Sequence, residues 1–449
     1  MTSHFEPVLR LPNMQDVGPE TLDQRDAFIK TLRGVLSLRG YERAETPILE
    51  QTELYIRKSG GELSSRLYDF SEPGGMDVSL RPEFTAAILR KTANYDLSSG
   101  PARIMYDGPV FRYASPEDAD GDKTRQFNQF GAEMIGAEAP YADGEVIAMA
   151  LEGLDALGVP DACAVVGHVG IIIDALNTYR LSERAKLFLI NNINALKQGL
   201  VESVSEQADA LGFTSNSHVD LEQAKADQDS ISSTIEQVMS EGSGVTLGQN
   251  TGMRSREDII SRLAKKMSQA DNPEDFLRAL DMLSNLSQIS GEIDQALDTA
   301  SKVMSKSGIK NNKFESLDQV INAAELEGVS KKRISIDFGM ARGVAYYTGM
   351  LFDVYSKGDK AEPLGGGGRY DGLTRALGYD KDIPSLGFAY NLDSVIDRTQ
   401  PTAESSKPSE IVSAMSEGSI ERAVAKARRL RSEGKKASID FANIRQGTK

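Results

Sequence analysis

A strand-like segment with an alternating pattern begins at Arg125 and reads Arg125-Gln126-Phe127-Asn128-Gln129-Phe130-Gly131-Ala132-Glu133. Successive side chains of a strand point to opposite faces, so Gln129, Gly131 and Glu133 share one face. Two polar residues on one strand face are, taken alone, most often exposed to solvent. The segments around this strand therefore decide whether its polar face is a surface or a site.

Two neighbouring segments carry groups that can bind charged ligands, although any one such pair is more often a solvated surface. In Leu80-Arg81-Pro82-Glu83-Phe84-Thr85-Ala86, Glu83 and Thr85 stand two apart, which predicts that they share one face of an extended segment. A carboxylate and a hydroxyl placed in this way can bind an ammonium group. Arg112 follows Phe111 and offers a planar guanidinium, which suits a carboxylate or a phosphate.

Glycines and tyrosines gather in two later segments. Residues 342–353 join an arginine to two adjacent tyrosines before an expected strand: Arg342, Tyr346 and Tyr347. A tyrosine offers a ring and a hydroxyl to a small polar ligand, although an isolated pair is by default half-buried in a sheet. The run Gly365–Gly368, which Tyr370 follows, allows close backbone approach to a ligand or is simply a flexible turn. It lacks the Gly-Lys-Ser/Thr ending of a P-loop.

Helical and strand-like patterns surround these segments in an order that favours an α+β fold. Apolar residues recur at helical spacing from Pro19 to Gly40. Pro47 cannot donate to a sheet ladder, so the extended segment around it belongs at an edge or an interface. Further strand-like runs cover residues 65–70, 78–80, 102–106, 128–135, 333–338 and 350–355. Such strands with flanking helices predict an antiparallel sheet covered by helices.

Helical patterns dominate from about residue 181 to 329. A helix is expected over 185–196, and a capping box at 255–258. A further helix should begin at Asn272-Pro273-Glu274-Asp275, which supplies a capping residue, a proline for the first turn and two acidic residues. A linker rich in proline and serine (401–408) leads to a basic helix at 419–434 and a strand at 437–441. We therefore expect four parts: the first part of a core (1–180), a helical insertion domain (181–329), the second part of the core (330–399), and a linker with a short C-terminal αβ fragment (400–449).

The composition argues against several classes of protein. The 449 residues carry a formal net charge of −15, which disfavours a broad nucleic-acid-binding surface. The sequence has no apolar run long enough to cross a membrane and no secretion signal at its N-terminus. The single cysteine, Cys163, fits a reducing compartment, and the three histidines are too far apart in sequence to indicate a zinc site. We therefore expect a cytoplasmic protein without a metal or a cofactor.

Taken in order, these segments resemble the core of a class II aminoacyl-tRNA synthetase, and specifically that of histidyl-tRNA synthetases. The matching segments are Gly40–Glu50 (motif 1), Leu80–Ala86, Phe111–Arg112 with Arg125–Glu133 (motif 2), Arg342–Phe352, and Gly365–Leu373 with Pro384–Val395 (motif 3 region). The resemblance covers about residues 8–180 and 330–398. It implies a six- or seven-stranded antiparallel sheet and dimerisation through motif 1. It also implies a set of histidine-binding residues: Glu83, Thr85, Arg112, Gln129, Glu133, Arg342, Tyr346, Tyr347 and Tyr370.

Two positions depart from the synthetase pattern. The family follows its motif 2 arginine with a glutamate two residues on, which holds the adenine of ATP, and this chain has Ala114 there. Motif 3 of the family ends in Gly-Leu-Glu-Arg, whose arginine grips the ATP phosphates, and this chain has Ser394 in place of that arginine. The motif 2 loop is also acidic at residues 117–120. Adenylation and tRNA charging are therefore expected to be impaired.

A chain that has the histidine-binding residues but lacks the ATP-binding glutamate and arginine resembles a second family. This family consists of the synthetase paralogs that serve as regulatory subunits of ATP phosphoribosyltransferase. Val166–Gly170 and Tyr346–Gly349 look closer to that family. The resemblance implies a non-catalytic subunit that gives a short-form catalytic subunit its allosteric response to L-histidine, in the first step of histidine biosynthesis. It also implies a homodimer within a hetero-oligomer, with tRNA not a partner. Two alternatives stay open: a functional histidine–tRNA ligase with a diverged ATP site, and a synthetase-like binding module with another partner.

Overall fold

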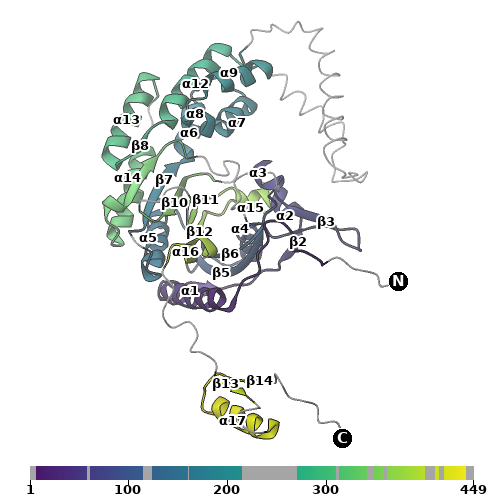
Figure 1. Cartoon of the computed structure of the whole chain (residues 1–449). Coiled ribbons are helices and arrows are strands. Elements are labelled where there is room, and N and C mark those ends of the chain that lie inside the picture. The colour runs from purple at the N-terminus through teal and green to yellow at the C-terminus, as the bar shows by residue number, and fades with distance from the viewer. Residues whose placement is uncertain are drawn as a thin grey trace.

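A computed structural model gives the arrangement of most of the chain (Figure 1). The residues that it describes are 7–57, 61–114, 124–159, 161–214, 271–309, 313–340, 347–357, 362–399, 410–413 and 419–440. Several sequence features lie outside these ranges, namely Arg342, Tyr346, the acidic residues 117–120, the capping box at 255–258 and the linker 401–408. The fold is a large central sheet with helices packed around it, which confirms the α+β prediction.

The central sheet has nine strands among the described residues, in the order β1-β5-β6-β12-β11-β10-β7-β9-β8. Their bounds are β1 (Glu42–Arg43), β5 (Ala102–Phe111), β6 (Gln126–Ile135), β7 (Cys163–His168), β8 (Ser290–Gly291), β9 (Ile334–Asp337), β10 (Met350–Tyr355), β11 (Gly365–Arg369) and β12 (Ser385–Asn391). The strands from β5 to β7 pair antiparallel, whereas β1 joins β5, and β9 joins β7, in parallel. The sheet is therefore wider than the six or seven strands expected, and it is mixed at its edges.

Helices cover one face of this sheet. They are α1 (Pro19–Leu38), α5 (Tyr141–Ala156), α6 (Val169–Leu176), α14 (Lys313–Leu326) and α16 (Leu392–Asp397). Side chains from α1 and α5, such as Leu32 and Leu151, join Phe130, Phe352 and Phe388 of the sheet in the largest apolar core. The burial of this face leaves the opposite face of the central strands available for a site.

The opposite face is bordered by short elements. These are α2 (Glu53–Ile56), α3 (Gly61–Ser64), α4 (Thr85–Thr92), α15 (Leu373–Ala376), and a small sheet of β2 (Leu49–Gln51), β4 (Asp77–Leu80) and β3 (Tyr68–Ser71). Phe84 and Ile88 pack with Tyr106, Tyr370 and Leu373 in a second core. This core fixes α4 against strands β5 and β6.

The helical part contains α7 (Glu183–Asn191), α8 (Ile193–Lys197), α9 (Val201–Ala210), α12 (Pro273–Ser287) and α13 (Ile293–Lys306), and Figure 1 shows these helices gathered at one end of the molecule. The side chain of Asn272 caps α12 by accepting from the backbone N–H groups of Glu274 and Asp275, as its sequence predicts. The helix expected over 185–196 is instead two helices that meet at Asn192. A short 3-10 turn, Lys331–Arg333, leads back to β9. The domain boundaries drawn from the sequence stay predictions.

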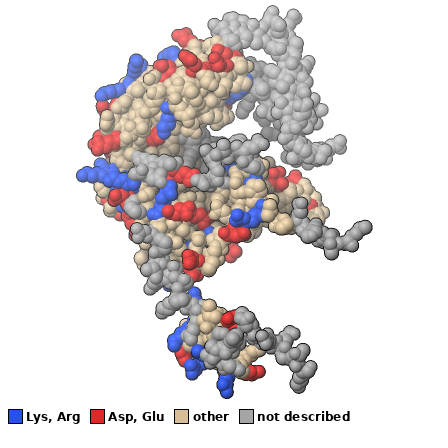
Figure 2. All heavy atoms as spheres, in the orientation of Figure 1, with Lys and Arg blue, Asp and Glu red and all other residues tan. Residues whose placement is uncertain are grey.

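A small βαβ unit lies near the C-terminus, with β13 (Glu410–Ser413) parallel to β14 (Ala437–Asp440) and α17 (Ile420–Ser432) between them. Val412, Ala423, Ala427 and Leu430 form its own small core. Figure 2 shows Lys and Arg side chains on its surface, and α17 contributes Arg422, Lys426, Arg428, Arg429 and Arg431. Within the described residues, no helix combines the length and the apolar character that crossing a membrane requires.

The glycine run Gly365–Gly368 is not a flexible turn but the strand β11, in the middle of the sheet. A Cβ atom at Gly367 would lie 2.7 Å from Cβ of Phe388, and one at Gly368 would lie 2.9 Å from Cδ1 of Tyr347. Backbone atoms of the two neighbouring strands lie at least as close to these positions. The glycines are therefore required by packing, because any larger residue would overlap the adjacent backbone and side chains.

We expect Gly367→Ala to destabilise the protein by about 1–3 kcal/mol, because the added methyl overlaps Phe388 and the adjacent backbone. Denaturant-induced unfolding measures the change. The matched control is Gly34→Ala in α1, where the methyl meets open space, and it should leave stability unchanged or raise it by about 0.5–1 kcal/mol. Equal stability of the two variants would contradict the position of β11.

Candidate functional site

The polar face of β6 is built as its alternation predicts. Glu133 of β6 lies opposite Gly387 of β12, which in turn lies opposite Gly368 of β11. Residues directly opposite each other in antiparallel strands point to the same face. Glu133 and Gln129 therefore stand at one side of a floor that lacks side chains, on the face that the long helices leave free.

The carboxylate of Glu133 is fully buried, with 1% of the residue exposed, and three hydroxyl groups donate to it. Thr85 Oγ1 donates over 2.7 Å, Tyr106 OH over 2.9 Å, and Tyr370 OH to the other carboxylate oxygen. Burial raises the pKa of Glu133 to about 7, although these hydrogen bonds act in the opposite direction. The Glu133 carboxyl group is therefore held in a fixed orientation, and it gains or loses its proton near neutral pH.

Glu83 does not lie on an extended segment with Thr85, as the sequence spacing predicted. Thr85 is instead the first residue of α4, and the Glu83 carboxylate accepts from the backbone N–H groups of Thr85 and Ala86 at the start of that helix. Carboxylates favour this position because the first N–H groups of a helix have no partner within it. Burial raises the pKa of Glu83, while the N–H groups and the charge of Arg112 act to lower it.

Gln129 lies on β6 between β5 and β12 and is 8% exposed, and its buried side-chain oxygen has no hydrogen-bond partner among the described residues. A buried acceptor without a donor costs about 1–3 kcal/mol. That cost is recovered if a ligand supplies an N–H group. The unpartnered atom is an acceptor, so it suits an ammonium or a ring N–H.

The remaining predicted residues border the same face. The ring of Tyr347 lies over Gly368, and Tyr370 is buried with its hydroxyl against the Glu133 carboxylate. Arg112 donates from Nε to the carbonyl of Pro82 over 2.9 Å, and its guanidinium lies 5.2 Å from the ring centre of Phe127.

Hydrogen bonds thus join Glu83, Thr85, Glu133 and Tyr370 into one chain, beside Gln129. The sequence did not identify Tyr106, the third donor to Glu133. It belongs to a strand that was expected, but only the pairing of Tyr106 with Gly131 brings its hydroxyl to Glu133. A Cβ at Gly131 would overlap the Tyr106 ring. The glycine in the alternating strand was therefore the one sign in the sequence that a large side chain lies over this position.

The two positions that depart from the synthetase pattern are both part of well-packed structure. Ala114 is buried, and its carbonyl accepts from Nε of Arg125 over 2.9 Å. Ser394 lies in the first turn of α16, next to Asp393. Asp393 accepts from Arg25 over 2.7 Å and from the backbone N–H of Asn128 over 2.8 Å, so the guanidinium of Arg25 is already engaged.

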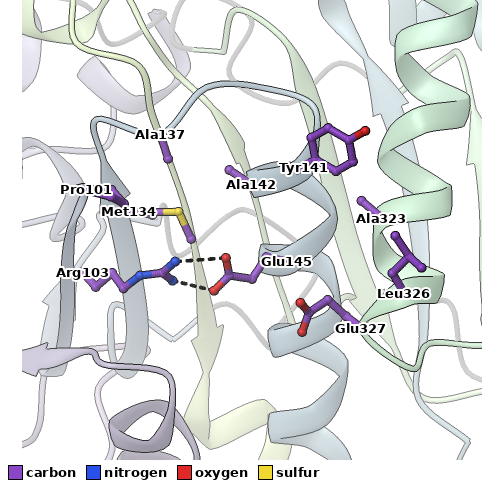
Figure 3. Close-up of a pocket in the computed structure, with 10 residues that line it drawn as sticks. All are labelled: Pro101, Arg103, Met134, Ala137, Tyr141, Ala142, Glu145, Ala323, Leu326 and Glu327. Carbon is purple, nitrogen blue, oxygen red and sulfur yellow. Dashed lines mark hydrogen bonds and ion pairs between the residues drawn. The ribbon is translucent and has the colours of Figure 1, made fainter.

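A cavity of about 240 Å³ lies elsewhere, between the N-terminal part of α5, the end of α14 and strands β5 and β6 (Figure 3). Arg103 and Glu145 pair across it, and Tyr141 and Leu326 border it. None of the predicted histidine-binding residues lines this cavity. Among the described residues, no group of three or more His, Cys, Asp or Glu side chains is arranged to hold a metal ion.

The comparison with protein families decides the family. The model of the family described as histidyl-tRNA synthetase matches residues 13–245 and 253–395. The chain belongs to the histidyl-tRNA synthetase family.

Curated members of the family are similar to this chain over most of its length. The histidine–tRNA ligase of Methanococcus vannielii is 28% identical over 383 residues, which are 85% of this chain and 74% of the relative. That of Sulfolobus acidocaldarius is 29% identical over 393 residues, 87% of this chain and 74% of the relative.

Solved structures share the synthetase-like fold. An ATP phosphoribosyltransferase regulatory subunit/histidyl-tRNA synthetase from Bacillus halodurans has a TM-score of 0.63 and 21% identity, and the match covers 98% of this chain and 95% of that one. A histidine–tRNA ligase subunit from Alicyclobacillus acidocaldarius has a TM-score of 0.56 and 22% identity, covering 88% of this chain and 98% of that one. At these identities the likeness concerns the fold alone, and it confirms the class II synthetase-like architecture.

Glu133→Gln should change how stability depends on pH. Because burial raises the pKa of Glu133 from 4.5 to about 7, the folded chain holds this proton more tightly than the unfolded chain. The stabilisation is complete below pH 4.5 and is lost as the pH rises through 7. The advantage of the parent over the variant should therefore shrink with rising pH, by at most about 1.4 kcal/mol per pH unit.

Denaturant unfolding between pH 4.5 and 8 measures this difference, with Glu42→Gln on the exposed strand β1 as control. A difference between Glu133→Gln and the parent that stays constant over this range would contradict the raised pKa of Glu133.

Proposed function

We propose that this chain binds L-histidine on the free face of its central sheet. The observation that carries the proposal is the buried Glu133 carboxylate, held by three hydroxyl donors beside a floor of glycines. An oriented carboxylate in a site that excludes water binds a ring N–H strongly and selects for it. Glu83 and Gln129 supply further acceptors, which suit the ammonium group of an amino acid.

The role that we propose for this site is regulatory. Its support is Ala114 and Ser394, which stand where the synthetase pattern has an adenine-binding glutamate and a phosphate-binding arginine. Loss of one charged or hydrogen-bonding group from a preorganised site costs about 3 kcal/mol in transition-state stabilisation. Arg25 is no evident replacement, because Asp393 engages it. The chain would then sense histidine within a complex of ATP phosphoribosyltransferase, as a homodimer bound to the short-form catalytic subunit.

A second candidate is a histidine–tRNA ligase, and the curated relatives favour it over the regulatory role. The relatives compared above carry that name and match 85% or more of the chain. Arg112 and Arg125 are also retained, and both lie beside the free face of the sheet. The two candidates share the histidine site and differ in the use of ATP.

Histidine binding should depend on the residues that border the glycine floor. We expect Glu83→Ala and Tyr347→Ala each to weaken L-histidine binding by more than about tenfold, because the first removes an acceptor and the second a wall of the pocket. Calorimetric titration measures the dissociation constants. Glu42→Ala, a surface carboxylate on β1, should bind like the parent. Parent-like binding by both pocket variants would show that histidine, if bound, lies elsewhere.

The use of ATP separates the two roles. We expect histidine-dependent ATP–pyrophosphate exchange by the purified chain to stay at background, with the Methanococcus vannielii ligase as the positive control, because the nucleotide-binding groups at 114 and 394 are missing.

Exchange at a rate comparable to that of the control would overturn the regulatory role and establish the ligase. Native mass measurement adds an independent result, since the regulatory role also requires a stable complex with a short-form ATP phosphoribosyltransferase. Background exchange without such a complex would leave a histidine-binding module with another partner.

A further inference from the structure

The most deeply buried ion pair in the described part of the chain joins Arg369 to Asp143. Arg369 ends β11 and is 4% exposed, and Asp143 lies in the first turn of α5 and is 1% exposed. Nη2 of Arg369 lies 2.6 Å from Oδ2 of Asp143, and Nε lies 3.1 Å from both carboxylate oxygens. Removing two charges from water is costly, so such a pair contributes little net stability over apolar residues of the same size.

The guanidinium of Arg369 also joins two turns by hydrogen bonds. Nη1 donates to the carbonyl of Ala137 over 2.9 Å, in the turn after β6, and to Asp371 over 3.0 Å, in the turn after β11. The same Asp371 oxygen accepts from the backbone N–H of Ser385 at the start of β12. One planar group thus sets the relative position of β6, β11, β12 and α5.

The backbone of Arg369 reaches the segment that carries Tyr347. The carbonyl of Arg369 accepts from the backbone N–H of Thr348 over 2.8 Å, and Thr348 Oγ1 accepts from the backbone N–H of Asp371 over 3.1 Å. Gly349 lets the two segments approach, because a Cβ there would lie 3.2 Å from Cδ of Arg369.

Both tyrosines of the proposed histidine site therefore adjoin this contact. Tyr347 precedes Thr348, and Tyr370 follows Arg369. Tyr347 lies over Gly368, and the Tyr370 hydroxyl donates to Glu133. A shift of Arg369 would move the ring of Tyr347 on one side and the hydroxyl of Tyr370 on the other.

We infer that Arg369 and Asp143 are positioning residues for the histidine site: they hold Tyr370, and through it the Glu133 carboxylate, in the orientation that accepts a ring N–H. The inference rests on the proposed function. It explains why a costly buried ion pair stands at this point of the sheet, since a fixed planar fork orients its neighbours better than apolar contacts do. A second ion pair, Arg103–Glu145, joins α5 to β5 but is partly exposed and borders the separate cavity of Figure 3.

A double-mutant cycle tests this inference with L-histidine as the only probe. Asp143→Asn should raise the dissociation constant about tenfold, and Tyr370→Phe should raise it by a similar factor. If Asp143 acts through the Tyr370 hydroxyl, the double variant should be weakened about as much as either single variant, rather than a hundredfold. Arg369→Lys keeps the charge without the fork and should behave like Asp143→Asn, which also covers the case that Asp143→Asn fails to fold.

Glu145→Gln is the matched control, because it weakens the other ion pair from α5 without touching the site. On its own it should leave histidine binding unchanged, and combined with Tyr370→Phe it should add nothing to the loss that Tyr370→Phe causes. Additive effects of Asp143→Asn and Tyr370→Phe, or a loss of thermal stability with unchanged histidine binding, would reduce the ion pair to a purely structural role and overturn the inference. A parent chain that does not bind histidine would refute the proposed function itself, which is a distinguishable result.

Discussion

The carboxylate of Glu133 is the contact on which the free face of the sheet depends. Its hydrogen-bond donors come from α4, from β5 and from the residue after β11, so one acceptor joins three separate stretches of chain. A buried carboxylate is tolerated only when such donors surround it, and each donor must hold a fixed position. The glycines of β6, β11 and β12 provide the room, because Cβ atoms there would overlap Tyr106, Tyr347 and Glu133. The glycines thus leave the space in which the Glu133 carboxylate and its hydroxyl donors are packed.

The sequence predicted those parts of the site that depend on local pattern. The alternation from Arg125 to Glu133 correctly placed Gln129 and Glu133 on one face, because the two-residue period of a strand alone decides it. The conformation around Glu83 was predicted wrongly, since a spacing of two fits a strand as well as an acid that caps the next helix. The position of β11 was missed because a glycine run has no apolar pattern, and only the side chains of neighbouring strands explain it. Tyr106 and the pair Arg369–Asp143 depend on contacts between residues that are distant in sequence.

The proposed amino-acid-binding residues follow the synthetase pattern, whereas two positions expected to bind ATP depart from it. The acceptors that we propose for the amino acid are closely organised, because hydroxyl groups orient Glu133 and the start of α4 orients Glu83. On the nucleotide side, the groups that the synthetase pattern uses for adenine and phosphate are replaced by a buried alanine and a serine beside an engaged ion pair. The curated relatives compared above are named histidine–tRNA ligases and are 28% and 29% identical to this chain.

Under the proposed function, Glu133 accepts a ring N–H of L-histidine. A crystal structure of the chain with L-histidine would show whether this contact forms. We expect an imidazole nitrogen about 2.7–3.2 Å from a Glu133 carboxylate oxygen, with the ammonium group beside Glu83 or Gln129. Histidine bound at a different surface, with the free face of the sheet unchanged, would contradict it.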